Sequence, residues 1–185
     1  MQKLDSIDII HYSGTNAVRL IEKVRFRVYQ IGDKVVHPMH GAGVVESIVQ
    51  KKVDGVVRDY YILKLPNRSM VVMVPTDSSD EIGVRPIVDG EQADRVLAAI
   101  PNIQVEMTSN WNHRYRENME RMKSGDLFEV AWVIKGLTAR DNIRGLSTGE
   151  RKMLHSAKQI LISEIVLAKS VSYESAEAAL NTALA

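Results

Sequence analysis

Trp111 stands at the head of a run of cationic residues, in the stretch SNWNHRYRENMERMKSGD at residues 109–126. If a helix begins near Trp111, an indole shares its first turns with Arg114 and Arg116. An exposed indole can stack on unpaired bases or wedge between them while arginines hold phosphates. The alternative is an ordinary tryptophan at the edge of a helical core, and spacing alone leaves both interpretations open. The stripe of this helix expected to face the core is Tyr115, Met119 and Met122.

A second cationic surface is predicted in GLSTGERKMLHSAKQIL, residues 145–161. Arg151, Lys152 and Lys158 share a helix whose first turn also offers free backbone amides, a natural place for a phosphate. The common alternative is a solvated helix face. The pattern by itself does not separate the two.

Residue patterns for catalysis or metal binding are weak. His37 and His40 flank Pro38-Met39, but no further histidine and no acidic cluster lies nearby, so surface or turn histidines are the better interpretation. GAGVV at residues 41–45 lacks the spacing of a phosphate-binding loop and precedes a strand. The serine of GLSTGE caps a helix and lacks the strand that precedes a hydrolase nucleophile. We therefore expect no enzyme, no cofactor and no metal.

Charge is distributed unevenly along the 185 residues, although the net charge is only +1. Residues 32–89 hold seven Lys and Arg against eight Asp and Glu, whereas residues 111–158 hold ten against six. This local excess of +4 indicates a moderate footprint for a polyanion, weaker than that of a strong nonspecific DNA binder. The chain has no cysteine and no apolar run long enough to cross a bilayer, so a cytoplasmic protein is expected.

Residues 33–75 carry strand signals, with runs of β-branched and aromatic residues broken by Gly41 to Gly43, Asp54-Gly55 and Pro66-Asn67. Asp54-Gly55 between two such runs predicts a hairpin. Four or five short strands without an intervening helix predict a small, strongly bent sheet or barrel.

After residue 89 the pattern becomes helical. Helices are predicted over residues 91–100, from Trp111 to Lys123, from Leu127 to Leu137, after the capping box Ser147 and Glu150, and after Ser172. The fold class is thus α+β, a small β domain followed by an all-helical domain. We divide the chain into a poorly ordered extension at 1–30, a β domain at 31–89 and a helical domain at 90–185.

Several segments, in order, resemble the CarD/CdnL family of bacterial transcription regulators. The resemblance covers about Gln30 to Leu184. It is carried by IGDKVVHPMHGAGVVESI, YYILKLP, VMVP, GVRPIV, NWNHRYRENMERMKSGD, VAWVIKGL and GLSTGERKMLHSAKQILISEIVLAK.

This resemblance implies a Tudor-like β domain that docks on the β subunit of RNA polymerase. It also implies a helical domain that meets promoter DNA at the upstream edge of the transcription bubble, near the −10 element. Trp111 would be the minor-groove wedge, and the protein would act as a monomer, associated with the nucleoid through polymerase and not with a membrane. The expected DNA-contacting residues are Trp111, Arg114, Arg116, Arg140, Arg144, Arg151 and Lys152.

Two positions depart from the family's polymerase contacts. Where the family often has arginines, this chain has Lys51 and Met73. Lys51 keeps a charge without the planar guanidinium, and Met73 keeps neither. We expect Lys52, Arg68 or exposed strand edges to compensate, because docking by strand addition needs mainly backbone. Two other functions remain open, a DNA-binding protein that acts without polymerase and a non-catalytic Tudor-like scaffold.

Overall fold

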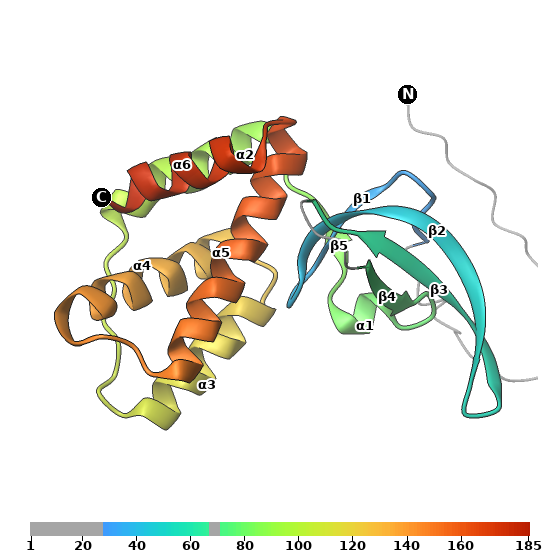
Figure 1. Ribbon diagram of the computed structural model, residues 1–185, viewed down its shortest axis with the longest axis horizontal. Coiled ribbons are helices and arrows are strands. Elements are labelled where there is room, and N and C mark those ends of the chain that lie inside the picture. The colour runs from blue at the N-terminus through green and yellow to red at the C-terminus, as the bar shows by residue number, and fades with distance from the viewer. Residues whose placement is uncertain (1–27, 67–70) are drawn as a thin grey trace, which may run out of the picture.

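The computed structural model describes residues 28–66 and 71–185, and it places a five-stranded sheet beside a group of helices (Figure 1). This confirms the predicted α+β class. In chain order the elements are β1 (Lys34–His37), β2 (Gly41–Val53), β3 (Val56–Lys64), β4 (Val71–Pro75), α1 (Ser79–Ile82), β5 (Arg85–Pro86), α2 (Gly90–Ala99), the 3-10 helix η1 (Ile100–Asn102), α3 (Trp111–Lys123), α4 (Leu127–Arg144), α5 (Thr148–Lys169) and α6 (Tyr173–Leu184).

The sheet is antiparallel in the order β4-β3-β2-β1-β5, and its long β2–β3 hairpin curves away from the helices (Figure 1). Asp54 and Gly55 turn this hairpin with φ of 51° and 83°, as their sequence predicts. On the inner face, Tyr61, Leu63 and Val74 are buried. The short elements α1 and β5 lie between β4 and α2, and β5 extends the sheet by pairing with β1.

Tyr29 belongs to the β core, although the sequence assigned it to the extension. Its hydroxyl donates to the carbonyl of Val84 at 3.0 Å, and its backbone N–H donates to the Tyr61 hydroxyl at 3.0 Å. The two tyrosine rings meet edge to face. Tyr29 therefore packs with the sheet because its polar atoms and its ring all find partners there. Residues 1–27, for which disorder was expected, lie outside the described residues.

Helices α3, α4, α5 and α6 begin at the positions predicted for them, and each start is capped by a side chain. Asn110, Asp126 and Ser172 each accept a backbone N–H of the following first turn, and Ser147 with Glu150 forms the complete capping box. By contrast, α4 continues to Arg144, past the predicted end at Leu137. Gly136 does not stop it, because the missing side chain makes room for Val105 and Met107, which pack against the helix there.

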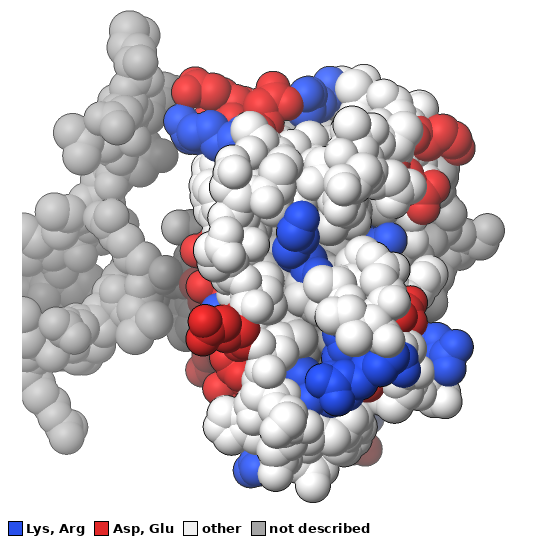
Figure 2. Space-filling model, turned by 90° about the vertical axis from the view of Figure 1, so that its left-hand side faces the viewer, with Lys and Arg blue, Asp and Glu red and all other residues white. Residues whose placement is uncertain are grey.

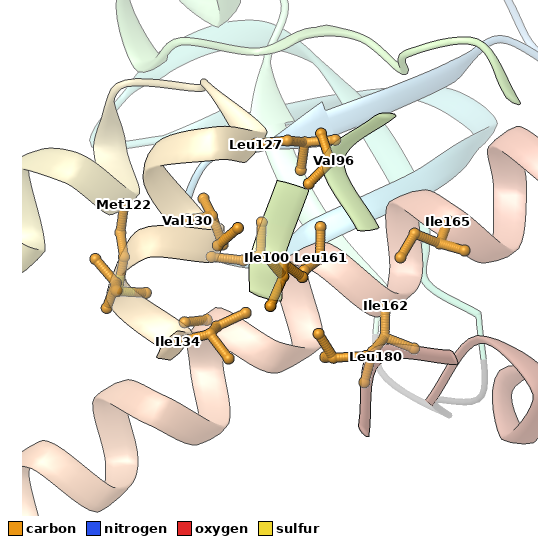
Figure 3. Close-up of a cluster of buried hydrophobic side chains, with 14 of the residues drawn as sticks. Val96, Ile100, Met122, Leu127, Val130, Ile134, Leu161, Ile162, Ile165 and Leu180 are labelled. Atoms are coloured by element: carbon orange, nitrogen blue, oxygen red, sulfur yellow. The ribbon is translucent and has the colours of Figure 1, made fainter. Parts of the chain in front are cut away.

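A single apolar cluster holds the helical domain together (Figure 3). It joins Val96 of α2, Met122 of α3, Ile134 of α4 and Leu180 of α6 around the middle of α5, where Leu161 is fully buried. Because α5 packs against α2, α4 and α6, it forms the axis of the domain. Both the candidate site and the contact with the sheet are built on this helix.

The junction between the sheet and the helices lies along the second half of α5. Gly41, with φ of 91°, brings the β1–β2 turn so close that an added Cβ would strike the Ser163 hydroxyl and lie 3.2 Å from Ile160 Cα. The Ser163 hydroxyl accepts the backbone N–H of Ala42 at 2.8 Å. This contact explains Gly41 as a site of close approach to a helix, whereas Gly43 lies against the backbone of Lys64 in β3.

An ion pair closes the same junction. Arg85 of β5 donates through Nη1 and Nη2 to the two oxygens of Glu164, at 2.6 and 2.9 Å. Glu164 has no exposed surface, and its Oε1 also accepts the backbone N–H of Val88. The Nε of Arg85 donates to the carbonyl of Gly125, so the same guanidinium also holds the α3–α4 turn. The sheet is thereby fixed in one orientation on α5.

Candidate nucleic-acid interface

Trp111 is the first residue of α3, and 44% of it is exposed. The side chain of Asn110 caps this helix by accepting the N–H of His113 at 3.1 Å. The indole stacks on Tyr115, four residues along the helix, with ring centroids 5.2 Å apart and an interplanar angle of 23°. The ring is therefore neither part of the core nor loose in solvent, and it keeps accessible surface next to the helix start.

The start of α5 contacts the indole along the edge that carries Nε1 and Cζ2. Trp111 Nε1 donates to the Ser147 hydroxyl at 3.1 Å, and a Cβ added at Gly149 would lie 3.5 Å from Cζ2 of the indole. Ser147 and Gly149 are 36 and 38 residues away from Trp111 in sequence. This tertiary contact was not predicted, although the capping box marked the position of Ser147.

Arg114 does not face solvent, which corrects its predicted role as a phosphate contact. It is 1% exposed, and its Nε and Nη2 donate to Glu150 Oε1 at 2.9 and 2.7 Å. Its Nη1 donates to the carbonyls of Thr108 and Ser109. Because these groups occupy the guanidinium, no face of Arg114 is left for DNA. The buried stripe of α3 is Arg114, Asn118 and Met122, with Tyr115 and Met119 only partly buried.

Glu150 supplies the charge that holds Arg114 inside. Burial acts to raise the pKa of the Glu150 carboxyl, but hydrogen bonds from the backbone and hydroxyl of Ser147 and from Arg114 outweigh it, so the pKa is lowered. Arg140 also faces this carboxylate, with Nε 3.3 Å from Oε1, although the pair lacks the alignment of a hydrogen bond. The Arg140 side chain is therefore mostly buried beside Glu150, and only part of it is available for the predicted contact with DNA.

The other predicted cations are exposed. Arg116 on α3, Arg144 at the end of α4, and Arg151 and Lys152 on α5 all face solvent. Within the part of the chain that the structure describes, no acidic group lies close enough to form an ion pair with any of them. Figure 2 shows Lys and Arg gathered on the lower half of the helical end of the molecule, the half where α3 and α5 begin in Figure 1.

The residues predicted for polymerase docking divide between two faces of the β2–β3–β4 sheet. Lys51 Nζ lies 3.4 Å from the Met73 sulfur, and Met73 is 38% exposed. Lys52, which pairs with Val57, is exposed as well. Because it follows Lys51 directly on β2 and successive side chains of a strand alternate, it points to the opposite face of the sheet. Arg68 lies outside the described residues.

The face that carries Lys51 and Met73 has further exposed groups that the sequence did not single out. Register places Arg58 opposite Lys51, and exposed Val71 lies two residues before Met73 on β4. We call Lys51, Arg58, Val71 and Met73 the outer sheet face. Within residues 28–66 and 71–185, β4 pairs only with β3, which leaves one of its edges without a strand partner.

His37 and His40 lie together at the β1–β2 turn, with ring centroids 4.5 Å apart. His37 Nδ1 accepts the backbone N–H of Met39 at 3.1 Å. Burial, together with repulsion from His40, lowers the pKa of His37 to about 4. The described residues contain no group of three His, Asp or Glu side chains that could hold a metal ion. The pair is a structural part of the turn that contacts α5.

Comparison with known proteins follows the same division into a sheet and a helical domain. Residues 29–88 match the CarD-like/TRCF RID domain, so the sheet is a Tudor-like module. Residues 95–181 match the CarD C-terminal domain. The putative transcription factor YdeB of Bacillus subtilis (strain 168) is 31% identical over 145 residues, which are 78% of this chain and 95% of that protein. The chain belongs to the CarD family of transcription factors.

None of the helices in the described part of the chain combines the length and apolar character needed to span a membrane.

Proposed function

We propose that this protein docks on the β subunit of RNA polymerase through its outer sheet face and the free edge of β4. From there it holds Trp111 and the neighbouring cations against promoter DNA at the upstream edge of the bubble, and it stabilises the open complex. The observation that carries the proposal is the half-exposed indole, held by Tyr115 and Ser147 at the start of α3, on helices α3 and α5 that also carry the exposed cations Arg116, Arg151 and Lys152. The protein performs no chemistry of its own in this scheme.

The two ends of the molecule have complementary tasks. Polymerase anchors the sheet, which raises the local concentration of the helical domain at the promoter, so a modest DNA affinity suffices. The indole then binds distorted or melted DNA better than a closed duplex. A preference of about 1.4 kcal/mol would shift closed toward open complexes roughly tenfold. Recognition by phosphate contacts and by DNA deformability makes the effect largely independent of base sequence.

Rigid attachment of the sheet to α5 supports this scheme. The Arg85–Glu164 pair and the close approach at Gly41 fix the sheet to the same helix whose first turn supports Trp111. A docked sheet would therefore place the indole at a defined distance and direction from the polymerase. Flexible tethering would raise the local concentration but would not aim the ring.

The test compares Trp111→Ala with Met73→Asp in the full chain. Trp111→Ala should leave co-elution with polymerase intact and shorten the open-complex lifetime, by up to about tenfold, because only the wedge is lost. Met73→Asp should abolish co-elution, since it puts a carboxylate on the outer sheet face, and should remove the effect on lifetime with it. Lifetime is measured by challenging promoter complexes with a DNA competitor.

Equal lifetimes for Trp111→Ala and the parent protein would contradict the wedge. An electrophoretic arm separates the chief rival, a DNA-binding protein that acts alone. If the isolated protein shifts duplex DNA at physiological salt as strongly as it does with polymerase, tethering is unnecessary. The excess of positive charge over residues 111–158 is only +4, which argues against that result.

A further inference from the structure

We propose that Ser147 and Glu150 are positioning residues for Trp111, which fix the indole in its DNA-contacting orientation before DNA arrives. This inference rests on the proposed function of Trp111 as a wedge. The Ser147 hydroxyl accepts the indole N–H at 3.1 Å and donates its own hydrogen to Glu150 Oε2 at 2.8 Å. The ring is thus joined to a buried carboxylate through a single hydroxyl.

The direction of these hydrogen bonds follows from the chemistry of the carboxylate. An ionised carboxyl group can only accept, so the hydroxyl of Ser147 must donate to Glu150 and turn its lone pairs elsewhere. Those lone pairs receive the indole N–H and the backbone N–H of Glu150, the latter at 3.3 Å. All bonding positions of the hydroxyl are therefore used. An ionised Glu150 leaves the hydroxyl as a fixed acceptor for the indole.

Glu150 divides its two oxygens between two tasks. Oε2 binds the backbone and hydroxyl of Ser147, while Oε1 accepts both hydrogen bonds from Arg114. Arg114 in turn binds the carbonyls of Thr108 and Ser109, in the segment that leads into α3. The carboxylate consequently holds the indole from α5 and, through Arg114, the backbone just before Trp111. Fixing a side chain before binding reduces the entropy lost on binding.

An ordinary helix cap is the alternative role for Ser147. Ser172 caps α6 in the same way, accepting the N–H of Ser175 at 3.2 Å, and among the described residues no indole N–H donates to it. Glycine is tolerated at a cap with little loss, so Ser147→Gly removes the hydroxyl while keeping the helix. Ser147→Thr restores a hydroxyl, and Ser172→Gly is the matched control for loss of a cap alone.

The experiment uses the full chain with Trp132→Phe, because Trp111 is then the only tryptophan of the two in the sequence. The indole N–H is observed by NMR in the free protein, through its chemical shift and its hydrogen exchange rate. Ser147→Gly should shift the signal and accelerate exchange roughly fivefold, as expected for loss of one net hydrogen bond. Ser147→Thr and Ser172→Gly should both resemble the parent.

Open-complex lifetime is measured on the same variants. Ser147→Gly should shorten the lifetime by up to roughly fivefold while polymerase co-elution is unchanged, since the indole is present but less often in place. An indole N–H that exchanges equally fast in Ser147→Gly and in the parent would overturn the positioning role. If the signal responds as expected but Trp111→Ala leaves the lifetime unaltered, the positioning stands and the wedge fails.

Discussion

The two ends of α5 each bury a glutamate that is paired with an arginine from another element. Glu150 binds Arg114 of α3 near the start of the helix, and Glu164 binds Arg85 of β5 near its end. Fourteen residues separate the two carboxylates, which is roughly four helical turns and about 21 Å. One helix therefore carries two ion pairs built on a buried glutamate, one beside the indole and one at the junction with the sheet.

The two pairs differ in what they hold. Glu164 is completely buried, and its partners are Arg85 and a backbone N–H, so that this end closes the junction with the sheet. Glu150 leads through the Ser147 hydroxyl to Trp111, which remains 44% exposed. The same buried pairing thus fixes a domain at one end and a partly exposed ring at the other. Removing one partner at the junction should therefore lower the free energy of unfolding. Removing one partner near the indole should instead impair the positioning of Trp111.

The largest expected effect is from Arg85→Met at the junction. It leaves Glu164 buried with one backbone donor, and removing one partner of a buried pair costs about 3–5 kcal/mol in the free energy of unfolding. Urea denaturation of the full chain measures it. Arg95→Met is the control, because its pair with Glu91 is exposed and contributes at most about 0.5 kcal/mol. Equal losses for the two variants would mean that the junction pair is no stronger than a surface one.

Gly41→Ala tests the close approach of the β1–β2 turn to α5. The left-handed backbone alone costs about 1–2 kcal/mol, and the collision with Ser163 and Ile160 adds about 1–3 kcal/mol of overpacking. Gly55→Ala is the matched control, since Gly55 also has a positive φ but faces open space at the hairpin tip. Denaturation curves for the two variants should differ by the overpacking term. If they coincide, the turn moves away from α5 without cost.

As the pH falls, the stabilising contribution of His37 at the β1–β2 turn should be lost before that of Glu150 near the indole. The pKa of His37 is about 4 in the folded chain against 6.5 ordinarily, so between these values the unfolded chain binds more protons. The free energy of unfolding therefore falls as pH drops from 6.5 toward 4. The contribution of Glu150, whose pKa lies below its ordinary 4.5, is present above that pH and is lost only at lower pH.

His37→Asn should remove most of the loss between pH 6.5 and 4.5, because the amide oxygen can still accept the Met39 N–H but does not titrate. Denaturation midpoints measured across this range test the expectation. His40→Asn is the comparison, since His40 acts on the pKa of His37 only through repulsion. An unchanged pH profile in His37→Asn would assign the acid sensitivity to other groups.

Local signals in the sequence predicted much of this protein. The Asp54-Gly55 hairpin and the starts of the helices after Asn110, Asp126, Ser147 and Ser172 depend on residues adjacent in the chain, and the structure confirms them. The end of α4 was predicted too early, at Leu137 instead of Arg144. Gly136 does not end the helix, and Val105 and Met107 from a preceding segment pack against the space it leaves. The exposure of Trp111, one of two open interpretations, agrees with the structure.

Arg114 and Arg116 mark the limit of such reasoning. Both arginines lie near the start of one helix, and both looked equally available for phosphates. Arg116 faces solvent, whereas Arg114 turns inward because Glu150, 36 residues later, offers it a buried carboxylate. Arg114, Asn118 and Met122 recur at four-residue intervals, which is the spacing of one buried helix face. This signal was missed because two of the three side chains are polar and were not expected in a core.

The sequence alone determined the α+β class, the periods of the strands and helices and the starts of α3, α4, α5 and α6, because hydrophobic spacing, capping and turn preferences act between near neighbours in the chain. Only the tertiary structure decided which cations face solvent, what supports the indole and how the sheet is fixed to α5. These outcomes depend on charges and hydrogen-bonding groups that come from distant segments, and a buried charge takes the position where its partner lies.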